Sequence, residues 1–141
     1  MTTRIEAAIA ARQAASICLT GGRTPEGLYT LLADERQPWR QRIDWGRLQV
    51  YWGDERHVPP DHPDSNFGMA HRALLSRVPI PAANLHRMRG EYPDPHAAAR
   101  EYDRELRPFD LMLLGLGEDA HIASVFPGSP LLENTTRSEE H

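Results

Sequence analysis

The side chain best suited to acid–base catalysis is His121, which follows the short segment from Gly115 to Gly117. An unperturbed imidazole titrates close to neutral pH, which makes His121 a candidate general base. Asp119, two residues earlier, either fixes the tautomer of that imidazole or caps a helix that follows. Residues 109–114 form an apolar run typical of a strand buried on both faces. Because ligands in open α/β sheets bind beyond the carboxyl ends of strands, His121 is predicted to lie in an active site.

A second candidate site is the turn Gly21-Gly22-Arg23-Thr24-Pro25, which follows a strand-like run at residues 15–20. Two glycines let the backbone come close to a ligand, and the amides at a helix start favour an anion. Arg23 adds a permanent positive charge, while Thr24 is expected to be the N-cap and Pro25 the first helical residue. The turn therefore predicts a phosphate site, although an ordinary capped strand-to-helix turn has the same pattern.

A third candidate segment is Asp54-Glu55-Arg56, which comes directly after a strand-like run at residues 48–52 and a glycine. The guanidinium of Arg56 can make a forked, permanently charged contact with a phosphate or a carboxylate. Asp54 and Glu55 either orient Arg56 or bind sugar hydroxyls. The alternative is that these charges belong to a solvated loop.

Neither a metal site nor a reactive thiol is expected. The spacing of His57, His62 and His71 matches no standard zinc pattern, and no cysteine accompanies them. Cys18 is the single cysteine, and nothing near it in sequence would activate a thiolate. We expect Cys18 to be a small buried hydrophobe.

Composition excludes several other functions. The net charge of −4 argues against general binding of nucleic acid or of a membrane surface. All sixteen basic residues are arginine, which rules out a Schiff-base lysine and a Walker-type phosphate loop within the 141 residues. With no apolar run long enough to span a bilayer, no hydrophobic secretion signal and one cysteine, a cytoplasmic protein is expected.

Helical and strand-like patterns alternate along the chain. Helices are expected near residues 3–14, after Pro25, over 67–78 behind a cap at Asp64 or Ser65, and after Asp94-Pro95; strands are expected at 15–20, 48–52, 84–88 and 109–114. This alternation predicts a largely parallel sheet with helices on both sides. Since there is no internal repeat or linker, residues 1–141 are expected to form one α/β domain.

Three ordered segments resemble the motifs of the 6-phosphogluconolactonase family. They are LTGGRTPEGLY, VYWGDERHVPPDHPDSN and FDLMLLGLGEDAHIASVFPGSP. The resemblance implies a three-layer αβα fold with a Rossmann-like, mainly parallel sheet, of the type found in glucosamine-6-phosphate deaminase and ribose-5-phosphate isomerase. It also implies hydrolysis of 6-phospho-D-glucono-1,5-lactone to 6-phosphogluconate in the pentose phosphate pathway, with no cofactor.

Lactone hydrolysis assigns roles to the candidate residues. His121 would activate the water, Asp119 would support His121, and Arg56 would hold phosphate or developing negative charge. The substrate-binding group is completed by Gly21, Gly22, Arg23, Thr24, Asp54, Glu55, Ser65 and Asn66. Since no G-x-S-x-G segment is present, direct attack by water is preferred over an acyl-serine route.

The chain departs from the family pattern in three respects. Ala120 stands where the family has glycine, and Arg23 replaces a small serine. Relative to the family, the sequence is expected to be shortened at the C-terminus and at the N-terminus. A sheet shortened in this way would expose an apolar edge, which a partner chain or homo-oligomer would cover.

Two alternatives to the lactonase remain at this point. One is a sugar-phosphate isomerase that resembles glucosamine-6-phosphate deaminase, whose family typically has DEY, SY and NEPGS where this chain has DER, SN and FPGS. The other is a homologue without activity that binds sugar phosphates or another subunit.

Overall fold

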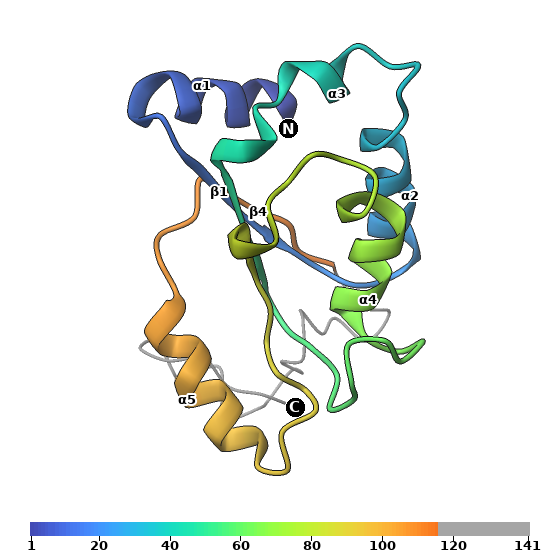
Figure 1. Ribbon diagram of the computed structural model, residues 1–141, viewed down its shortest axis with the longest axis vertical. Coiled ribbons are helices and arrows are strands. Elements are labelled where there is room, and N and C mark those ends of the chain that lie inside the picture. Colours follow the sequence, from blue (N-terminus) through green and yellow to red (C-terminus); the bar gives the residue numbers. More distant parts are fainter. Residues whose placement is uncertain (116–141) are drawn as a thin grey trace.

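The computed structural model describes residues 1–115, which form a parallel sheet with helices on both faces (Figure 1). The strands are β1 (Ala15–Leu19), β2 (Leu48–Trp52), β3 (Leu85–His86) and β4 (Leu111–Met112). Their order in the sheet is β3-β2-β1-β4, and every pair is parallel. The carboxyl ends of all four strands therefore meet at one edge of the sheet.

One face of the sheet carries most of the helices. They are α1 (Thr2–Arg12), α2 (Arg23–Leu32), α3 (Trp39–Arg42) and α4 (Asn66–Ala70), with α4 continued by the π-helical turn η2 (His71–Leu75) and with short 3-10 turns at η1 (Trp45–Arg47) and η3 (Ala82–Asn84). Alternate strand residues, such as Ile17 in β1 and Val50 in β2, point into this layer and form the larger core with Tyr29 and Leu74. Within the described residues, no helix is long and apolar enough to cross a membrane.

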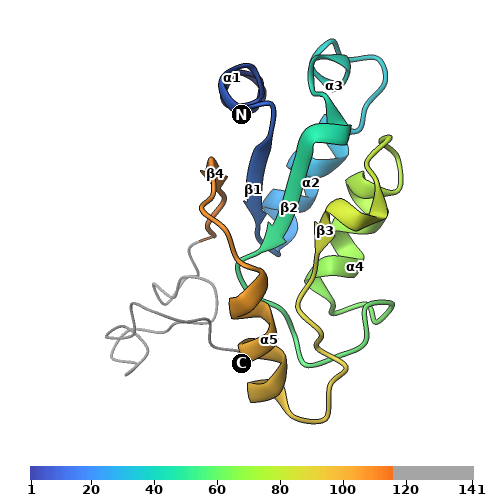
Figure 2. The same ribbon diagram turned by 60° about the vertical axis from the view of Figure 1, so that its left-hand side comes forward.

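The opposite face is covered by α5 (Pro95–Glu105), which lies apart from α2 and α4 (Figure 2). Tyr51 of β2, Met88 and Tyr102 of α5 form a second, smaller core there. The helix begins where expected, because the Asp94 side chain accepts a hydrogen bond from the His96 amide at 2.9 Å. The predicted αβα layering, with an all-parallel sheet in these residues, is confirmed.

Two helix predictions need correction. Helix α2 begins at Arg23 with Gly22 as its N-cap, so Thr24 is not the N-cap and Pro25 is not the first helical residue. Gly22 has φ 109°, a conformation that favours glycine, and this turns the chain into the helix two residues earlier than predicted. The helix expected over 67–78 is α helical only to Ala70, after which it continues as η2.

The prediction of a strand buried on both faces at residues 109–114 is wrong. β4 comprises two residues, and Met112 and Leu114 are 46% and 57% exposed. β4 lies at the edge of the sheet, and among residues 1–115 only β1 pairs with it. The start of β4 is nevertheless held firmly, because Asp110 accepts hydrogen bonds from the Ser16 amide at 2.8 Å and from Arg12.

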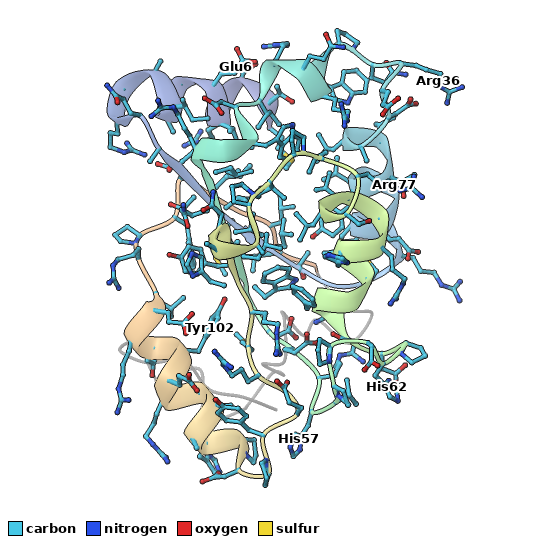
Figure 3. The ribbon with its side chains drawn as sticks, in the orientation of Figure 1. Glu6, Arg36, His57, His62, Arg77 and Tyr102 are labelled. Carbon is cyan, nitrogen blue, oxygen red and sulfur yellow. The ribbon has the colours of Figure 1, made fainter. Side chains whose placement is uncertain are left out.

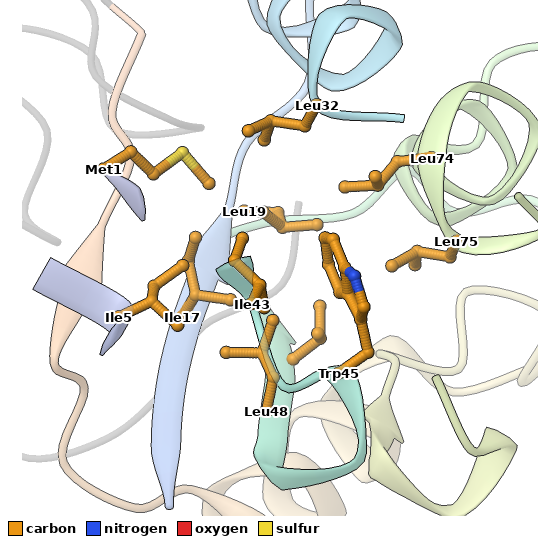
Figure 4. A pocket seen from close by; sticks show the side chains of 11 residues that line it. Met1, Ile5, Ile17, Leu19, Leu32, Ile43, Trp45, Leu48, Leu74 and Leu75 are labelled. Atoms are coloured by element: carbon orange, nitrogen blue, oxygen red, sulfur yellow. The ribbon is translucent and has the colours of Figure 1, made fainter. Parts of the chain in front are cut away.

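The larger core contains a cavity of about 10 Å³ lined by apolar side chains, among them Ile5, Leu19, Trp45 and Leu74 (Figure 4). A space of this size is at the lower limit for one water molecule, and an apolar lining offers water no hydrogen bonds. The cavity is therefore a packing defect and not a substrate site.

Candidate active site

The loops that follow β1 and β2 start side by side at the carboxyl edge. Leu19 and Trp52 are paired across the two strands, and the amide of Gly53 donates to the carbonyl of Leu19 at 2.9 Å. Two of the predicted motifs, the Gly21-Gly22 turn and the Asp54-Glu55-Arg56 segment, are thereby brought together although more than thirty residues separate them.

Two buried tyrosine hydroxyls hold the backbone immediately before these loops. Tyr29 of α2 accepts from the Thr20 amide at 3.0 Å and donates to the Thr20 carbonyl at 2.7 Å. Tyr102 of α5 accepts from the Trp52 amide at 2.7 Å and lies 2.9 Å from the His86 carbonyl (Figure 3). Burial raises the pKa of both tyrosines above the ordinary value. Sequence reasoning missed these hydroxyls, since their partners lie on other elements of the fold.

The Asn66 side chain joins three of the predicted segments. Its amide nitrogen donates to the carbonyl and the carboxylate of Asp54 at 3.2 and 3.3 Å. Its amide oxygen lies so close to Gly21 that a Cβ at that position would collide with it. Asn66 is itself buried, so it packs beneath the glycine turn instead of standing free in solvent.

Glu55 is a buried carboxylate, only 3% exposed. One oxygen accepts from the amides of Arg56 and Asn66, each at 2.7 Å, and the other accepts from the Ser65 hydroxyl and the Phe67 amide, each at 2.9 Å. The carboxylate thus ties the loop after β2 to the start of α4. Whether Glu55 also meets substrate stays a prediction.

Ser65 is the N-cap of α4, and of the two predicted candidates, Asp64 and Ser65, it is the one that caps the helix. Its hydroxyl accepts from the Gly68 amide at 3.0 Å and donates to Glu55, and its side chain is fully buried. These protein contacts account for the position of Ser65. Its predicted contact with substrate is not tested by the geometry.

The Gly21-Gly22 turn presents the start of α2 at the same edge. The first amides of an α-helix have no acceptor within the helix, and the helix dipole adds partial positive charge there. Arg23, Thr24 and Arg56 are exposed to solvent around this region of the chain. The arrangement suits an anion, and phosphate binding by these residues stays a prediction.

The third predicted motif continues past the described residues. His121, Asp119 and Ala120 lie outside them, so their predicted roles stand as sequence predictions. The chain leading to them runs along the same edge, since a Cβ on Gly53 would be 3.8 Å from the Met112 side chain and one on Gly115 would be 4.0 Å from the Thr20 hydroxyl.

Among residues 1–115, no group of histidine, cysteine and acidic side chains is arranged to hold a metal ion. His57 and His62 lie apart (Figure 3), and each has a protein contact: His57 with the Tyr92 carbonyl at 2.8 Å and His62 with the Asp64 amide at 3.0 Å. Cys18 is buried as predicted, and burial together with the negative charge of Asp54 raises the pKa of its thiol to about 12.

Comparison with known proteins agrees with the three motifs. Residues 1–139 match the model of the family described as glucosamine-6-phosphate isomerases/6-phosphogluconolactonase. A 6-phosphogluconolactonase from Synechocystis sp. is 47% identical over 143 aligned residues, which cover 94% of this chain and 57% of that protein.

Solved structures are similar to this chain over the same part of their length. The crystal structure of a protein named devB superposes with a TM-score of 0.81 and 40% identity, covering 91% of this chain and 57% of that one. The structure of 6-phosphogluconolactonase from Trypanosoma brucei gives a TM-score of 0.78 and 33% identity, covering 95% of this chain and 59% of that one. The chain thus spans a little over half the length of the proteins it matches.

Proposed function

Because this chain belongs to the family of glucosamine-6-phosphate isomerases and 6-phosphogluconolactonases, we propose that the protein hydrolyses 6-phospho-D-glucono-1,5-lactone to 6-phosphogluconate. The reaction is a step of the pentose phosphate pathway. One structural observation carries the proposal: at the carboxyl edge of the sheet, the Asn66 side chain contacts both Gly21 and Asp54. Parallel α/β sheets bind their ligands at this edge.

In the proposed mechanism, one set of residues binds the negative charge and a second set transfers the proton. The amides of the Gly21-Gly22 turn, with Arg23 and Arg56, hold the phosphate or the negative charge that develops on the carbonyl oxygen. Water attacks the lactone carbonyl while His121 takes its proton, and Asp119 keeps the His121 imidazole in the required tautomer. The ring C–O bond then breaks, and the ring oxygen leaves as a hydroxyl after receiving the proton that His121 took from the water.

The deciding experiment is an assay of lactone hydrolysis by the purified protein at its full natural length, corrected for spontaneous ring opening. We expect His121→Ala to lower kcat by about a hundredfold or more, the usual contribution of a general base. His96→Ala, which changes an exposed histidine in the first turn of α5, is the matched control and should leave kcat unchanged.

Two results would redirect the assignment. Turnover of glucosamine 6-phosphate in place of the lactone would favour the deaminase-like isomerase. A folded protein that binds 6-phosphogluconate without any turnover would identify a homologue that binds sugar phosphates and does not react with them.

A cytoplasmic location and a homo-oligomer belong to the same proposal. The exposed Met112 of β4 and the exposed Leu114 just after it support an association that covers this edge. Sedimentation velocity on the purified protein measures that association directly, and a strictly monomeric protein would contradict it.

A further inference from the structure

The Glu55 carboxylate has its whole hydrogen-bonding capacity taken up by the protein. An ionised carboxylate offers about four acceptor positions on its two oxygens. Four donors occupy them at 2.7–2.9 Å: three backbone amides, of Arg56, Asn66 and Phe67, and the hydroxyl of Ser65. No acceptor position is left for a sugar hydroxyl, which separates Glu55 from the residues that would touch substrate.

Two of these donors, the amides of Asn66 and Phe67, are the first two amides of α4. Amides in the first turn of a helix need acceptors from outside the helix, and a negative charge is favourable there. A buried carboxylate likewise requires donors for both of its oxygens. Glu55 and the start of α4 satisfy each other, so the backbone position of Asn66 depends on Glu55.

From Asn66 the dependence extends to the glycine turn. The Asn66 amide oxygen occupies the space that a Cβ on Gly21 would need. A shift in the Asn66 backbone therefore moves the side chain against which the Gly21-Gly22 turn packs. The Arg56 amide is bonded to the same carboxylate, so the loop that carries the Arg56 guanidinium is fixed at the same point.

We propose that Glu55 is a positioning residue of the active site, which sets Asn66 against Gly21 and so aligns the turn amides and Arg56 toward one anion. This inference rests on the proposed function for the identity of the anion, the phosphate of a sugar-phosphate lactone. Glu55 itself does not contact substrate.

The first test does not depend on activity. In Glu55→Gln one carboxylate oxygen becomes an NH2 group, which accepts no hydrogen bond. The two donors that faced this oxygen lose their acceptor, so the start of α4 must shift. We expect the ¹H–¹⁵N resonances of Gly21 and Gly22 to move in this variant. They should stay in place in Asp61→Asn, which removes an exposed carboxylate from the same loop. Unchanged Gly21 and Gly22 resonances in a folded Glu55→Gln protein would overturn the inference.

The second test measures the dissociation constant of 6-phosphogluconate. We expect Glu55→Gln and Asn66→Ala each to weaken binding by about tenfold, comparable to the loss of a charge-assisted hydrogen bond. If Glu55 acts through Asn66, the double variant should bind no more weakly than the poorer single variant, because coupled residues are not additive. Strictly additive losses would contradict the proposed route.

The two tests also separate this inference from the proposed function. A wild-type protein that neither hydrolyses the lactone nor binds 6-phosphogluconate would refute the function, while the glycine resonances would still decide the role of Glu55. Should Glu55→Gln fail to fold, Glu55→Asp takes its place. It keeps the charge but withdraws it by one methylene, and the same resonances should move by less.

Discussion

At the scale of single residues, Gly21 is a position with no room for a side chain. Its close neighbour is the side chain of Asn66, and the adjacent Gly22 has the positive φ that turns the chain into α2. Glycine is therefore required at both positions, for different reasons. At Gly21 there is no space for a Cβ, and at Gly22 the backbone has a positive φ.

We predict that Gly21→Ala destabilises the protein by about 1–3 kcal/mol, because the new methyl group collides with Asn66. Adding Asn66→Ala should recover part of that loss. Gly27→Ala is the matched control within α2, since a Cβ there meets nothing within 4 Å. It should stabilise the protein by about 0.5–1 kcal/mol. Urea unfolding measures all three, and equal effects at Gly21 and Gly27 would contradict the collision.

At the scale of elements, the ends of β1 and β2 are anchored by helices from opposite faces. Tyr29 reaches the end of β1 from α2, and Tyr102 reaches the end of β2 from α5. Neighbouring strands separate just beyond these points, so the tyrosine hydroxyls satisfy backbone groups that the sheet no longer pairs.

We predict that Tyr102→Phe costs about 1–3 kcal/mol of stability, because the buried amide of Trp52 loses its acceptor. Tyr51→Phe is the control: this ring lies in the same small core, and among residues 1–115 no hydrogen bond of its hydroxyl is found. It should change stability by less than about 0.5 kcal/mol. Chemical denaturation decides between them, and similar losses in both variants would remove the anchoring role of the Tyr102 hydroxyl.

At the scale of the whole molecule, stability at high pH depends on buried side chains that stay protonated in the folded protein. Burial raises the pKa of Cys18 from 9.0 to about 12 and that of Tyr29 from 10.0 to about 12. Above pH 9 the unfolded chain therefore releases protons that the folded protein retains, which favours unfolding as the pH rises.

We predict that the free energy of unfolding is insensitive to these groups below about pH 9 and falls steadily between about pH 9 and 12. Cys18→Ala removes the group that titrates first, so it should flatten the decline between pH 9 and 10 whatever its effect on stability at neutral pH. Thermal unfolding at a series of pH values measures both slopes. An identical slope in the two proteins would show that the thiol is not protected by burial.

Local patterns in the sequence were sufficient for most elements of the fold. Apolar spacing identified the helices and strands and their alternation, because periods of 3.6 and 2 residues follow directly from helix and strand geometry. Cap chemistry placed the start of α5 at Asp94 and that of α4 at Asp64 or Ser65, of which the structure uses Ser65, since those hydrogen bonds join residues two or three positions apart. The start of α2 was predicted two residues too late. Thr24 and Pro25 matched the usual pattern of a helix start, whereas the positive φ of Gly22 lets the helix begin at Arg23.

What only the tertiary structure decided are the contacts between residues distant in sequence. The seat of Asn66 beneath Gly21, the four donors to Glu55 and the tyrosine anchors all depend on which strands lie side by side. The exposure of Met112 also depends on strand order, because the same apolar run can form a central strand or an edge strand of a sheet. The sequence by itself determined the family, the elements and the candidate residues; sheet order determined how the described candidates meet, because hydrogen bonding and burial act through space and not along the chain.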